Sequence, residues 1–217
     1  MKKNKVSELQ VVLTVLFVSS LLISNVITAK QVLLPFGITM TGAVVIFPVT
    51  YILSDLFSEV YGYRWSRFTC YLAFTMNLLA VVVFSIVIVT PAPDYWTNQE
   101  AFQAVLGSTP RVLVASLSAF VIGDLVNDRI FRRMKKKYID SHKGFAWRAI
   151  LSSFAGEVVD SLIFLPLAFL GQMPLETLAI MMVTQVSIKT GYEIIILPLS
   201  TKIVKYVSKK ENRVKRT

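Results

Sequence analysis

Cysteine, histidine and charged residues are all scarce in this 217-residue sequence. Cys70 and His142 are the single members of their types, and only 17% of the residues are charged. One cysteine permits no intrachain disulfide, and one histidine offers no cluster of metal ligands, so we expect neither a metal site nor a cofactor. The low charge, together with 54% hydrophobic residues, excludes an ordinary soluble enzyme.

The sequence has long apolar runs instead. A helix that crosses a bilayer needs about 20 mostly apolar residues to span roughly 30 Å of hydrocarbon. Runs of this kind predict an all-α polytopic membrane protein, a six-helix bundle that forms one domain over 1–217. Pro48, Pro166 and Pro198 fall inside these runs and are expected to mark kinks or broken helices. The expected spans are 9–29, 41–60, 68–89, 112–130, 146–170 and 175–203.

The distribution of basic residues predicts the orientation. There are 23 Lys and Arg against 13 Asp and Glu, and nearly all the basic residues fall on one side of the six spans. Lys30 and Arg111 are assigned to the other side. By the positive-inside rule both termini are expected in the cytoplasm. The basic residues flank apolar runs, so the expected partner is the lipid bilayer and not nucleic acid.

Ionisable residues inside the spans are the candidates for function. They occur in pairs three or four residues apart, which places both members on one helix face. Each acid at a helix centre costs about 2.5 to 3.5 kcal/mol on insertion, whereas each Leu or Ile returns only about 0.3 to 0.6. The pairs therefore predict a polar interior cavity. They are Asp55 with Glu59, Asp124 with Asp128, Glu157 with Asp160, and Lys189 with Glu193.

Depth along each helix ranks these groups. With a rise of about 1.5 Å per residue, Glu157 and Lys189 come close to the midplane of the bilayer, and Asp55 is also expected to be buried. Glu59 and Asp128 approach the cytoplasmic interface. The first group is expected to bind a ligand, and the second is a candidate for gating or coupling.

Each group also has a purely structural interpretation, which the sequence leaves open. Lys189 could form an ion pair with Glu193 or Glu157 that only fixes the helix register. The paired aspartates of the fourth span could bind nearby arginines at the membrane surface. Asn25 and Asn77 could simply bond to other helices.

Aromatic residues accompany the acidic ones. Tyr51 lies about one turn before Asp55, and Phe154 precedes Glu157 by three residues. A ring supplies a stacking face for a planar heterocycle, while a carboxylate accepts paired N–H donors. The combination suits a flat, nitrogen-rich ligand.

Five strings distributed over most of the chain carry a family resemblance. They are SNV at 24–26, FPVTYILSD at 47–55, EVYG at 59–62, GEVVDS at 156–161 and KTGYE at 189–193. Together they resemble the bacterial queuosine precursor transporter family, also called the vitamin uptake transporter family. The resemblance implies uptake of small 7-deazaguanine bases, namely 7-cyano-7-deazaguanine or its aminomethyl relative, with queuine as a further substrate in salvaging bacteria.

This substrate class suggests roles for individual residues. A 7-deazaguanine presents an N1–H and an exocyclic amino group, which one carboxylate, Glu157 or Asp160, can accept together. Lys189 is expected to donate to the ring carbonyl. The substrate-binding candidates are Asn25, Tyr51, Asp55, Phe154, Glu157, Asp160, Lys189 and Glu193, and the gating or coupling candidates are Glu59, Asp124 and Asp128.

Several alternatives stay open at this point. The sequence has no P-loop, so ATP hydrolysis by this chain is not expected, and proton coupling competes with facilitated diffusion. A second hypothesis is the substrate-capture subunit of an energy-coupling-factor importer, and a third is a structural membrane protein. An intramembrane aspartyl protease is disfavoured because Val121 stands where its Gly-x-Gly-Asp motif needs glycine. The oligomeric state is open, and a homo-oligomer is among the options.

Overall fold

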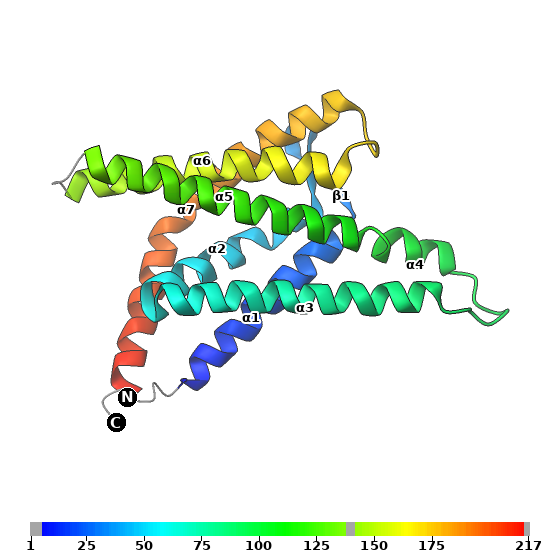
Figure 1. Ribbon diagram of the computed structural model, residues 1–217, viewed down its shortest axis with the longest axis horizontal. Coiled ribbons are helices and arrows are strands. Elements are labelled where there is room, and N and C mark those ends of the chain that lie inside the picture. Colours follow the sequence, from blue (N-terminus) through cyan, green and yellow to red (C-terminus); the bar gives the residue numbers. More distant parts are fainter. Residues whose placement is uncertain (1–5, 138–141, 215–217) are drawn as a thin grey trace. The chain divides into compact units, whose positions relative to one another are not determined.

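The computed structural model describes residues 6–137 and 142–214, and these residues are mostly helical (Figure 1). A short two-stranded sheet follows the first helix. In chain order the elements are α1 (Glu8–Ile27), β1 (Gln31–Leu34), η1 (Pro35–Gly37), β2 (Ile38–Thr41), η2 (Gly42–Val45), α2 (Phe47–Leu56), the π-helical turn η3 (Phe57–Tyr61), α3 (Tyr63–Val89), α4 (Gln99–Leu106), α5 (Thr109–Lys137), α6 (His142–Phe169) and α7 (Leu175–Val214).

Within the described residues, four helical stretches are long and apolar enough to cross a membrane. They are Glu8–Ile27, Tyr63–Val89, Gln99–Gly123 and Leu175–Ile196. The first two lie close to the spans predicted over 9–29 and 68–89. α6 covers the predicted span 146–170 as a single helix of 28 residues. The helical membrane class therefore agrees with the sequence, whereas the count of six spans and the cytoplasmic termini stay predictions.

The expected second span, 41–60, is not one continuous helix, and its crossing of the membrane stays a prediction. Residues 41–60 contain the end of β2, the short helix η2, ten residues of α2 and most of η3. Pro48 lies in the first turn of α2, where its missing N–H has no helical partner to lose, so it marks a helix start. Pro166 and Pro198 behave differently, because α6 and α7 continue through them without a break.

The chain divides into two compact units. Unit 1 comprises Met1–Lys30, Thr41–Thr109 and Tyr192–Thr217. Its core joins α1, α2, η3, α3 and the C-terminal part of α7, with the rings of Phe17 and Phe57 in edge-to-face contact at 5.7 Å. Asn25 on α1 donates a hydrogen bond of 2.8 Å to Asn77 on α3.

Gly42 joins the end of α1 to the segment that leads into α2. Its backbone N–H donates to the carbonyl oxygen of Lys30 at 2.7 Å. A Cβ atom at this position would lie 2.6 Å from the carbonyl oxygen of Ile27, which is closer than real Cβ contacts. Only glycine therefore fits this approach without a shift of the backbone.

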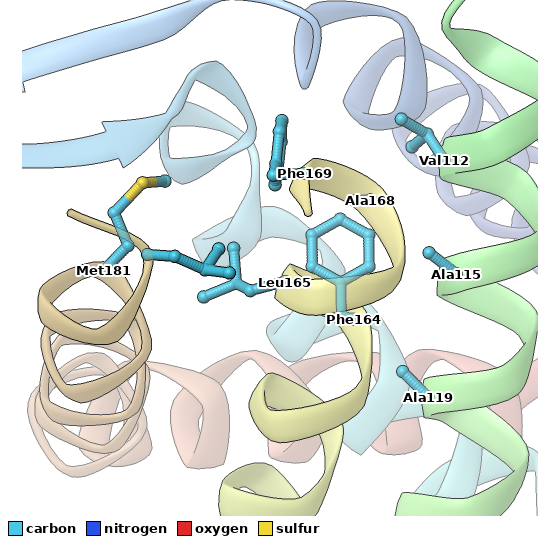
Figure 2. Close-up of a cluster of buried hydrophobic side chains, with 9 residues drawn as sticks. Val112, Ala115, Ala119, Phe164, Leu165, Ala168, Phe169 and Met181 are labelled. Atoms are coloured by element: carbon cyan, nitrogen blue, oxygen red, sulfur yellow. The ribbon is translucent and has the colours of Figure 1, made fainter. Parts of the chain in front are cut away.

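Unit 2 comprises Gln31–Met40 and Pro110–Gly191. In its core α6 lies between α5 and α7, as Figure 2 shows. Ala115, Ala119 and Gly123 follow one another at four-residue intervals on α5, and small residues of this kind let membrane helices approach closely. A Cβ atom on Gly123 would lie 3.1 Å from the carbonyl oxygen of Gly156 on α6.

Candidate functional site

Six polar residues of α6 and α7 form hydrogen bonds between the two helices within unit 2. We call this set the polar seam; it consists of Glu157, Asp160 and Ser161 on α6 and Gln185, Lys189 and Thr190 on α7. The ammonium Nζ of Lys189 lies 2.6 Å from Oδ2 of Asp160. Thr190 Oγ1 donates to Oε2 of Glu157 at 3.2 Å. Gln185 Nε2 donates to Oγ of Ser161 at 3.4 Å.

The local sequence explains why these side chains meet. Positions 157, 160 and 161 share one face of α6, and positions 185 and 189 share one face of α7. The connection between Phe169 and Leu175 is short and turns at Gly171, which has a φ of +84°, so the two helices run antiparallel. At the end nearer this turn, Leu165 and Met181 continue the contact with apolar side chains (Figure 2).

Burial makes the ion pair of the seam unusual for a membrane helix. Lys189 is 7% exposed and lies inside the candidate span Leu175–Ile196. A lone ammonium in such a place is costly, and an oppositely charged partner offsets part of that cost. Asp160 supplies that partner and keeps 28% of its own side chain exposed. Part of the Asp160 side chain is therefore left uncovered by the protein.

The seam combines donors and acceptors that can bind a flat polar molecule. Asp160 and Glu157 offer carboxylate oxygens, Lys189 offers N–H donors, and the hydroxyls can do either. The structure therefore brings together three of the predicted substrate-binding residues on two helices. It pairs Lys189 with Asp160, a partner that the sequence did not single out for it.

Three other predicted residues are placed separately. Phe154 lies on α6 one turn before Glu157, and the residue is 42% exposed. Asn25 belongs to unit 1 and bonds to Asn77, so the expected bond between helices is present. Glu59 is exposed in η3 of unit 1. Their roles in binding or coupling stay predictions.

Five predicted residues have side chains outside the part that the structure describes, although their backbones belong to α2, α5 and α7. No contact is assigned to them here, and their roles also stay predictions. They are Tyr51, Asp55, Asp124, Asp128 and Glu193.

A second polar cluster, in unit 1, was missed by the sequence analysis. Ser7 Oγ and Tyr61 Oη both donate to Oε1 of Glu211, the latter at 3.0 Å, and Glu211 is 4% exposed. We call these three residues the terminal cluster. Burial and the bond to Glu211 raise the pKa of Tyr61 above its usual value. The sequence signal was weak, since Glu211 is an acid among the basic residues of the C-terminal tail.

Comparison with known proteins identifies the family. The model of the family described as "Putative vitamin uptake transporter" matches residues 41–203, which is most of the chain and includes the polar seam. This chain belongs to that family. It is also 26% identical over 164 residues to the "Probable queuosine precursor transporter" of Bacillus subtilis (strain 168), covering 75% of this chain and 71% of that protein. No solved structure matches the chain.

Membership of the vitamin uptake transporter family confirms the resemblance carried by the sequence strings. Four of the five strings fall within the matched residues, and two of these, at 156–161 and 189–193, contribute five of the six residues of the polar seam. Family membership also identifies the protein as a transporter of small molecules in a membrane, which accords with its long apolar helices.

Proposed function

We propose that this protein imports queuosine precursors of the 7-deazaguanine type across the inner membrane of a bacterium. The proposed substrates are 7-cyano-7-deazaguanine and its aminomethyl relative, with queuine as a further substrate. In this proposal the chain spans the membrane six times and keeps both termini in the cytoplasm. The name of the Bacillus subtilis relative supports the substrate class.

One observation carries the proposal. Lys189 and Asp160 form a 2.6 Å ion pair inside a candidate membrane span, and the carboxylate of Glu157 lies on the same face of α6 as Asp160. Ionisable groups at membrane depth generally mark a path for substrate or ions. A 7-deazaguanine has paired N–H donors for one carboxylate and a ring carbonyl for the ammonium, so its edge complements these groups.

Complementation tests the function directly. A bacterial strain that cannot make the precursor, supplied with it at low external concentration, should regain queuosine in its tRNA only when this chain is expressed. Mass spectrometry of tRNA nucleosides gives the readout. Absence of queuosine at normal membrane abundance of the protein would contradict the proposal.

A matched pair of variants tests the role of Glu157. Replacing it by Gln keeps the shape and the bond to Thr190 but removes the charge, and uptake of labelled precursor should be abolished. Glu176→Gln, an exposed change in the first turn of the same α7 helix that carries Lys189, should leave uptake intact. Wild-type uptake by Glu157→Gln at equal membrane abundance would refute the assigned role.

The main rival is the substrate-capture subunit of an energy-coupling-factor importer, which depends on separate ATPase subunits. The two hypotheses differ in what the chain can do alone. Expression in a host that lacks such ATPase subunits should still give precursor uptake if this chain is a complete transporter. Uptake that appears only when those subunits are co-expressed would establish the rival.

A further inference from the structure

The polar seam contains a buried amide that is only partly satisfied. Gln185 lies one helical turn before Lys189 on α7 and is 1% exposed. Its Nε2 reaches Ser161, which is fully buried on α6, over a long 3.4 Å hydrogen bond. Its Oε1 has no hydrogen-bond partner among the residues that the structure describes.

A buried polar group without a partner costs free energy, so the unpartnered oxygen of Gln185 destabilises this interface unless a ligand binds to it. Leu165 and Met181 belong to the same helix pair and show that apolar side chains are accommodated there.

We infer that Gln185 is a specificity-determining residue that binds the amino-bearing edge of the substrate. The inference rests on the proposed function, because it assumes a 7-deazaguanine at the polar seam. On such a base one carboxylate can accept N1–H and one N–H of the exocyclic amino group. The second amino N–H and the adjacent ring nitrogen N3 remain, as a donor beside an acceptor. A carboxamide has the complementary acceptor and donor.

Position supports this assignment. Gln185 shares a helix face with Lys189, and its amide reaches Ser161, which follows Asp160 in α6. The amide is therefore about one helical turn, roughly 6 Å along the axis, from the ion pair. Gln185 was not among the residues expected from sequence, since it is uncharged.

Competition for uptake provides the test. The experiment measures uptake of labelled 7-cyano-7-deazaguanine in the presence of an unlabelled competitor. The competitor is either 7-deazaguanine or 7-deazahypoxanthine, which lacks the amino group. In the wild type 7-deazaguanine should compete about a hundredfold more strongly, because its amino group donates one N–H to the carboxylate and the other to Gln185. In Gln185→Leu this preference should fall to about tenfold, because the carboxylate still accepts one amino N–H.

Thermal melting of the same variants separates recognition from structure. Gln185→Leu should melt close to the wild-type temperature, because removal of the unsatisfied oxygen offsets loss of the long bond to Ser161. Met181→Leu, a change of similar volume in the apolar part of the same interface, is the packing control and should keep the full wild-type preference. A Gln185→Leu variant that melts well below this control would show that the amide serves the fold, and would overturn the inference.

The remaining outcomes are also decisive. The Gln185→Leu variant could take up precursor at the wild-type level and still prefer the amino-bearing competitor as strongly as the wild type does. That result would overturn this inference and leave the proposed function standing. Failure of the wild type to take up any of these bases would remove the proposed function, and the inference with it.

Discussion

Tyr61 donates a hydrogen bond to Glu211, which lies 150 positions later in the chain. Ser7 donates to the same carboxylate oxygen, so one buried acid holds together the start of α1, the turn η3 and the end of α7 (Figure 1). All three belong to unit 1. The terminal cluster therefore joins the first and last described helices of the chain within unit 1.

Removing the Tyr61 hydroxyl should weaken that closure. Tyr61→Phe leaves a buried charged acceptor with one donor fewer, and hydrogen bonds to charged groups contribute about 1.5 to 3 kcal/mol. We expect the purified variant to have a lower melting temperature in detergent. Size-exclusion chromatography after heating measures this temperature. Tyr95→Phe removes the hydroxyl of an 85% exposed tyrosine and serves as the control. Equal melting of the two variants would contradict a stabilising role for the cluster.

The raised pKa of Tyr61 predicts a loss of stability in alkaline solution. Its folded pKa lies above the unfolded value near 10, so the folded state holds the phenolic proton more tightly. The stability that Tyr61 contributes is present below about pH 10 and is lost as pH rises beyond it. The wild type should therefore lose melting temperature more steeply above about pH 10 than Tyr61→Phe does. Parallel curves for the two proteins would argue against this linkage.

The Lys189–Asp160 pair predicts a difference between folding and transport. Lys189→Met leaves a partly buried carboxylate without its cation, and breaking a buried pair in this way costs about 3 to 5 kcal/mol. Because Asp160 is partly exposed, we expect a loss toward the lower end of that range, seen as reduced membrane abundance. The double variant Lys189→Met, Asp160→Asn should recover abundance but not uptake. Recovery of both would make the pair purely structural.

Two glycines should respond in opposite ways to alanine. Gly42→Ala forces a Cβ atom against the backbone oxygen of Ile27 and should lower the free energy of unfolding by about 1 to 3 kcal/mol. Gly191→Ala adds a methyl group in open space inside α7, where alanine favours the helix by up to about 1 kcal/mol. Melting of both variants in detergent checks the contrast. Little or no loss for Gly42→Ala would show that the backbone there shifts easily, and a loss for Gly191→Ala would contradict the expected gain in helix stability.

Much of the helical framework follows from apolar length and flanking charge. These features gave α1 and α3 to within a few residues, because a bilayer span has a fixed length. They did not give the strands Gln31–Leu34 and Ile38–Thr41, since strands of four residues leave no periodic signal. Hydropathy also predicted one span over 41–60 without showing that several short elements divide it. It registers apolar content and carries no information on backbone contacts such as that of Gly42 with Lys30.

The site was predictable in its composition but not in its pairing. Spacing along one helix showed that Glu157 and Asp160 share a face. It could not show that Asp160 is a partner of Lys189, because that depends on the register set by the turn between α6 and α7. Gln185 carried one usable signal, its distance of four residues from Lys189. Because an amide carries no charge, the cost of burying charges in a membrane did not single out Gln185.

Arg111 illustrates how a cation can be accommodated on the proposed outer side. Its guanidinium donates to the carbonyl oxygens of Leu167 and Leu170, at 2.6 and 2.7 Å, and so covers the C-terminal end of α6. That end carries the negative pole of the helix. The helix terminus thus serves as counter-charge, and Arg111 fastens the first turn of α5 to the last residues of α6 without any acidic side chain.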